Sequence, residues 1–230
     1  MKTLVNVARY HLVDRITYVA LPWGILAFSF LINVAIAAMA PNQPLGGIKT
    51  GGLVSIYVFL FVCGVVSMTR ELPFGLMLGV SRRGYYLGTA LLVLALGIAY
   101  GLALTVLQVL ERASGGWGFS LHYFRVPWIM DGPWYQTWVT SFVLLVLFFL
   151  YGMWYGLAYR RWGLVGLATF VVAQMLVALA VVAVVTLTHH WTAFGHFFTT
   201  VQAPALTGVL AALTLALGLG GFTTMRRVTV

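Results

Sequence analysis

Six long stretches of the chain contain no Asp, Glu, Lys or Arg, and this feature constrains the fold most. A helix needs about 20 apolar residues to cross the roughly 30 Å hydrocarbon core of a bilayer. Apolar residues run continuously through each stretch, which is typical of helices and not of alternating barrel strands. The stretches are 19–40, 52–69, 85–110, 134–159, 163–188 and 205–225. The sequence therefore predicts an all-α integral membrane protein with six transmembrane helices.

The overall composition excludes a soluble globular domain. Of the 230 residues, 62% are hydrophobic and 7% are charged, whereas soluble domains carry about 25% charged residues. So few charges could not cover a water-facing surface. No composition shift marks a second domain, so we expect residues 1–230 to form a single transmembrane domain.

The formal net charge is +9, and the basic residues that produce it are distributed as expected for a membrane protein with a fixed orientation. If the N-terminus is cytoplasmic, six spans leave only Lys49, Arg112 and Arg125 of the 13 Lys and Arg residues outside. Lys and Arg collect in cytoplasmic loops. We therefore expect a multi-pass protein of the plasma membrane with both termini cytoplasmic, and no nucleic-acid partner.

Three segments outside the spans have patterns of their own. Apolar residues recur at helical spacing in residues 1–16, which favours an amphipathic helix lying in the membrane interface. The outer segment 111–133 is the longest loop and is rich in Gly and aromatic residues, and its role stays open. The uncharged segment 189–204 favours a partly embedded hairpin or interfacial helix.

The chain lacks the residues that common membrane chemistry requires. No span holds an ionisable residue that could carry a coupling proton or cation. The sequence before Lys49 does not match a phosphate-binding P-loop, because Gln43 and Ile48 occupy the positions where that motif requires glycine. His189 and His196 have no acidic or cysteine partner nearby, and the single Cys63 excludes an internal disulfide. We expect no catalytic residues, metal or cofactor in this chain, so an enzyme is a minority interpretation.

Polar and small residues inside the spans have two interpretations. Asn33, Gln136 and Gln174 would contact a substrate along a pathway or hydrogen-bond between helices. Gly pairs at four-residue spacing let helices approach closely, and they would serve packing or form a sliding surface that a moving transporter needs. These pairs are Gly97 with Gly101 and Gly152 with Gly156.

The loop between the second and third spans has the pattern of a short amphipathic helix over residues 71–79. Pro73 suits its first turn, Gly79 suits its end, and Phe74, Met77 and Leu78 share one face. Charged residues flank this apolar face, and they are Glu71, Arg82 and Arg83. The face would either insert into a groove of a soluble partner or lie on lipid headgroups.

This loop resembles that of small six-span permeases of ATP-binding-cassette (ABC) exporters, the type-2 class. The resemblance rests on Leu72, Pro73, Phe74, Gly75, Leu78, Gly79, Ser81, Arg82, Arg83, Tyr86, Leu87 and Gly88. A second stretch resembles one actinobacterial-type subgroup, and it consists of Leu12, Val13, Asp14 and Arg15 followed by Leu21, Pro22 and Trp23.

The resemblance implies a transport subunit that takes its energy from another polypeptide. Residues 1–16 would be the connecting helix, 71–79 the coupling helix and 189–204 an outer re-entrant element. Two permease copies, or this chain and a related permease, would bind separate ATPase subunits that hold ATP and Mg. Phe74 and Leu78 would enter the ATPase groove, with Glu71, Arg82 and Arg83 fixing the orientation.

Apolar spans suit an amphipathic, lipid-like or drug-like cargo better than a sugar or an ion. Three other classes stay open on the sequence. They are a substrate-capture subunit of a vitamin or metal uptake transporter, a membrane scaffold that anchors a soluble partner, and an intramembrane enzyme.

Overall fold

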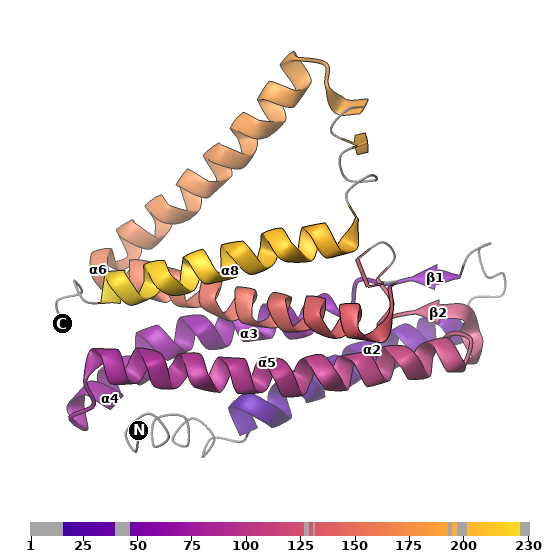
Figure 1. Ribbon diagram of the computed structural model, residues 1–230, viewed down its shortest axis with the longest axis horizontal. Helices are drawn as coiled ribbons and strands as arrows, with labels where there is room; N and C mark the ends of the chain where they lie inside the picture. The colour runs from indigo at the N-terminus through magenta and orange to yellow at the C-terminus, as the bar shows by residue number, and fades with distance from the viewer. Residues whose placement is uncertain are drawn as a thin grey trace.

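The computed structural model describes residues 16–39, 47–126, 129–130, 132–192, 195–196 and 202–225, and these residues are mostly helical. The long helices are α2 (Leu21–Met39), α3 (Val54–Val66), α5 (Arg82–Ala113), α6 (Trp134–Leu187) and α8 (Ala203–Met225) (Figure 1). Shorter elements are η1 (Ile16–Ala20), η2 (Ser67–Glu71), α4 (Leu72–Met77), η3 (Gly116–Ser120), β1 (Ile48–Lys49) and β2 (Leu121–His122).

Five helical segments of the described chain are long and apolar enough to cross a membrane. Their bounds are Tyr18–Met39, Val54–Met77, Arg82–Ala113, Trp134–Leu187 and Ala203–Met225. The second segment continues through η2 and α4, so it extends beyond the predicted end at residue 69. The described chain is therefore mostly helical, and its long helices are compatible with a membrane. It contains five such helical segments, whereas the sequence predicted six.

The fourth and fifth predicted spans form one 54-residue helix, α6, that is broken at Gly163. Gly163 has φ 65° and ψ −158°, a backbone conformation essentially restricted to glycine. Residues 160–162, expected to lie between two spans, are helical. The part of α6 after the break leaves the bundle at an angle, and α8 lies along the part before it (Figure 1).

Glycines bring α6 against α3 and α5. A Cβ on Gly152 would overlap the carbonyl oxygen of Phe61, and one on Gly156 would crowd Met68. Gly64 of α3 meets the Phe149 carbonyl in the same way. Nearer the start of α6, Gly97 and Gly101 of α5 face Phe142 and Trp138, so α5 approaches α6 through these two glycines. Such close approach maximises van der Waals contact between helices in a membrane.

The segment after α5 is folded onto the bundle. β1 and β2 form a two-residue parallel pair in which Ile48 lies opposite Leu121, and these strands depart from the all-α prediction. Tyr123 and Phe124 are buried, and their rings contact Phe30 of α2 at centroid distances of 5.3 and 5.6 Å. We call this end of the bundle the β end, and the opposite end, which holds α4 and the break in α6, the α4 end (Figure 1).

One predicted segment lies almost entirely outside the described residues, and another lies partly outside them. The predicted connecting helix over 1–16 has only Ile16 inside them, where η1 begins. Of the predicted outer element over 189–204, residues 193–194 and 197–201 are outside.

Candidate functional site at the α4 end

The helix α4 is short because its sequence limits it at both ends. Pro73 lies in the first turn, where a missing N–H costs nothing. Gly79 has φ 80°, and its N–H donates to the Leu76 carbonyl at 3.0 Å. The Val80 N–H donates to the Gly75 carbonyl, also at 3.0 Å, which completes a Schellman-type helix end.

One face of α4 is buried and the other is exposed. Leu72 is buried, and a Cβ on Gly75 would press on the ring of Tyr85. Phe74, Met77 and Leu78 are 46%, 83% and 63% exposed, respectively. These three apolar side chains, here called the α4 face, are the residues that the sequence placed on one side of the helix.

Tyrosine hydroxyl groups hold α4 and η2 to the bundle. The Tyr18 hydroxyl donates to the Glu71 carboxylate at 2.8 Å, and Tyr100 of α5 donates to the Tyr18 carbonyl. The Tyr85 hydroxyl donates to the Ser67 carbonyl at 2.8 Å. Glu71, expected to face a partner, therefore also fixes α4 to the start of the first helix.

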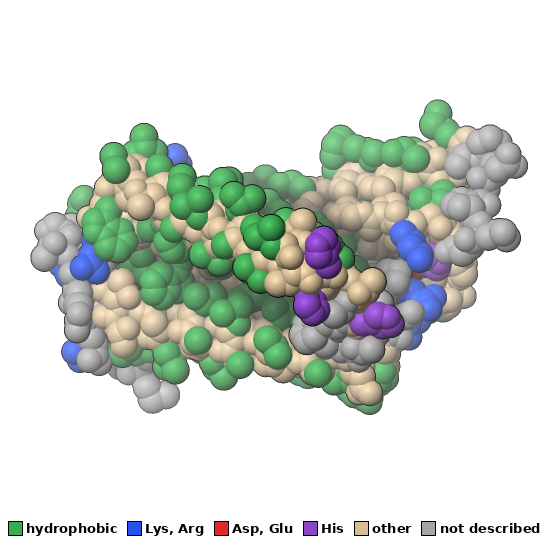
Figure 2. All heavy atoms as spheres, turned by 90° about the horizontal axis from the view of Figure 1, so that it is seen from above, with side chains coloured by type: hydrophobic (Ala, Val, Ile, Leu, Met, Phe, Trp, Pro, Cys, Tyr) green, Lys and Arg blue, Asp and Glu red, His purple; other side chains and the backbone are tan. Residues whose placement is uncertain are grey.

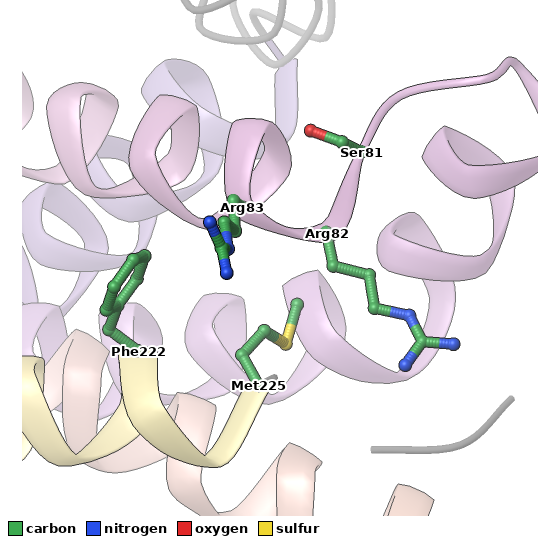
Figure 3. Close-up of a pocket in the computed structure, with 5 residues that line it drawn as sticks. All are labelled: Ser81, Arg82, Arg83, Phe222 and Met225. Carbon is green, nitrogen blue, oxygen red and sulfur yellow. The ribbon is translucent and has the colours of Figure 1, made fainter. Parts of the chain in front are cut away.

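Arg82 and Arg83 occupy the first turn of α5, which Ser81 caps by accepting from the Gly84 N–H at 3.1 Å. Arg83 points toward Phe222 and Met225 of α8, whereas Arg82 extends in another direction (Figure 3). These side chains line a cavity of about 310 Å³. The two arginines thus differ in what they face, which the sequence could not distinguish.

The structure does not bring the three predicted pathway residues together. Asn33 donates to the Ser29 carbonyl of its own helix at 2.8 Å. Gln136 lies in the first turn of α6, beside Gly132. Gln174 lies beyond the break and accepts from the Tyr151 and Tyr155 hydroxyls, the latter at 2.8 Å. Gln174 therefore joins the two parts of α6.

Glu111 at the β end is a structural site that sequence reasoning missed. Its carboxylate is buried and accepts from the backbone N–H groups of Tyr123, Phe124 and Arg125 at 3.0, 2.8 and 3.1 Å. The Trp117 indole N–H donates to it at 3.2 Å. Burial raises the pKa of the Tyr123 hydroxyl, which itself donates to the Leu26 carbonyl. The available signal was an acidic residue directly after the uncharged predicted span 85–110.

Figure 2 shows Lys and Arg side chains gathered at the two ends of the molecule, with hydrophobic side chains between them. Within the described ranges, no three His, Cys, Asp or Glu residues group as a metal site. Comparison of the chain with protein-family models, curated proteins and solved structures finds no significant match.

Proposed function

We propose that this protein is the transmembrane permease subunit of an ABC exporter. The α4 face carries the proposal, because an apolar surface at the end of a bundle of membrane-compatible helices suits a groove in a soluble partner. A separate ATPase subunit would bind there and supply ATP and Mg.

The proposed topology has six spans in the plasma membrane and both termini in the cytoplasm. The break at Gly163 supports six spans, because it divides α6 into residues 134–162 and 164–187. Each part is long enough to cross the hydrocarbon core at 1.5 Å per residue. The arginines at the α4 end support a cytoplasmic position for that end.

Coupling would pass from α4 into the bundle through the tyrosine contacts. A push on α4 reaches the first helix through Glu71 and Tyr18, and reaches α5 through Ser67 and Tyr85. Two permease copies, or this chain and a related permease, would enclose the pathway of an amphipathic, lipid-like or drug-like cargo.

The double variant Phe74→Asp/Leu78→Asp tests the docking role. Two carboxylates on the α4 face should abolish recovery of the ATPase when the tagged protein is purified from native membranes. Met39→Asp is the matched control, because Met39 is 82% exposed at the β end of the bundle. Recovery of the ATPase at wild-type yield with the double variant, folded to wild-type helicity, would refute the docking assignment.

A further inference from the structure

An apolar groove runs between α5, α6 and α8 on the side of the α4 end. Its cavity volume is about 350 Å³, and its walls include Val93 and Leu94, Val146 and Leu150, and Leu215 and Leu219. Leu94, Leu215 and Leu219 are 43%, 68% and 69% exposed, so the groove opens at the surface of the bundle.

The polar groups of the groove wall are bonded within the protein. The Tyr86 hydroxyl donates to the Gly218 carbonyl at 2.6 Å, and the Thr214 hydroxyl donates to the Leu210 carbonyl at 2.7 Å. The groove therefore presents a hydrocarbon-like surface. In a membrane an acyl chain fills such a surface without leaving a hydrogen-bonding group unsatisfied.

The groove adjoins the cavity that Arg83 faces. Tyr86 lines the groove, Phe222 lines the cavity, and their rings are in contact at a centroid distance of 5.9 Å. Arg83 makes no hydrogen bond or ion pair with the residues that the structure describes. A guanidinium group here is available to a phosphate, for which its fork of N–H donors is well suited.

The length of the groove matches the length of a lipid acyl chain in one leaflet of the bilayer. From Arg83 to Leu94, the eleven-residue rise along α5 is about 16 Å. Half of the hydrocarbon core of a bilayer is about 15 Å. An acyl chain that begins beside Arg83 would therefore end near the bilayer midplane, where the groove ends.

We propose that the groove and the Arg83 cavity together bind one anionic membrane lipid, with its phosphate at Arg83 and an acyl chain along α5 and α8. Charge complementarity selects an anionic headgroup, and the apolar wall selects a lipid over a free phosphate. This site does not depend on the proposed ATPase partner.

The test uses the full-length protein in nanodiscs of equal phosphatidylglycerol and phosphatidylcholine, released into mild detergent for native mass spectrometry. We expect the wild-type protein to retain phosphatidylglycerol in preference to phosphatidylcholine. Arg83→Gln should lower the retained phosphatidylglycerol at least fivefold. Arg70→Gln, which removes an exposed arginine near α4 that does not line the cavity, should retain it at the wild-type level.

A second pair of variants separates a lipid from a phosphate. Ala211→Phe places a ring in the groove and should also lower retention, whereas Ala212→Phe on the exposed side of α8 should not. The proposal is overturned if the wild-type protein shows no preference between the two lipids. This outcome is measured on the wild-type protein alone, so it does not depend on the folding of any variant. Equal retention by the Arg83 and Arg70 variants, or loss in Arg83→Gln without loss in Ala211→Phe, also overturns it.

Discussion

Glu111 shows how one side chain organises a loop. Its carboxylate collects three consecutive backbone N–H groups and an indole N–H, so the segment after α5 closes over a buried negative charge. Buried N–H groups without acceptors would cost free energy, and the carboxylate accepts from two buried and two partly buried N–H groups at once.

Replacing Glu111 with Gln should destabilise the β end. Gln keeps one acceptor oxygen and turns an NH₂ group toward N–H donors, so at least one donor loses its partner. We expect a loss of about 2 kcal/mol, or a melting temperature lower by roughly 4 to 8 °C, in detergent. Thr188→Ala is the control, because among the described residues that exposed hydroxyl bonds only to carbonyls of its own helix. Equal melting temperatures for the two variants would contradict this role of Glu111.

The sequence predicts the structural roles of some residues and not of others. Gly79 ends α4 because a local backbone rule places glycine there, and the exposed positions of Phe74, Met77 and Leu78 follow from helical spacing. The bonds of Glu111 and Gln174 depend on which helices become neighbours. A single sequence does not contain that information.

At the scale of elements, periodicity and uninterrupted apolarity predicted the long helices, while their ends depended on single residues. The adjacent basic residues Arg160 and Arg161 indicated a loop, yet the helix continues through them and breaks at Gly163. Backbone hydrogen bonding sustains a helix through charged residues, whereas the positive φ of Gly163 interrupts it. The strands β1 and β2 are too short to leave a periodic signal.

Replacing Gly163 with Ala should disturb the arrangement of the two parts of α6. A Cβ at φ 65° and ψ −158° is strained, so we expect a cost of about 1 to 3 kcal/mol, measured by thermal unfolding. Gly24→Ala is the control, because Gly24 is helical and a Cβ there meets nothing within 4 Å. It should leave the melting temperature unchanged or slightly raised. A Gly163→Ala protein as stable as the control would show that the break does not need glycine.

At the scale of the whole molecule, the part of α6 after Gly163 is apolar and exposed along its length. Leu164, Val165 and Leu187 are 72%, 77% and 79% exposed. Such a helix requires lipid or another apolar surface around it. This exposure supports a membrane environment, and it leaves a surface that the proposed second permease copy could cover.

Thiol labelling tests the proposed topology. Cys63 is buried, so introduced cysteines can be compared over a low background. Ser114 and Thr223 are exposed near opposite ends of the bundle. We expect a membrane-impermeant reagent to label Ser114→Cys in intact cells and Thr223→Cys only after permeabilisation. Labelling of both cysteines in intact cells would contradict a cytoplasmic α4 end.

The composition of the complex that the tagged wild-type protein forms in its native membranes tests the assignment as an ABC exporter subunit. Purification in mild detergent should recover a soluble ATPase with a P-loop in stoichiometric amount, together with two permease subunits and ATP hydrolysis. An intact complex that contains no ATPase would contradict the assignment as an ABC exporter subunit.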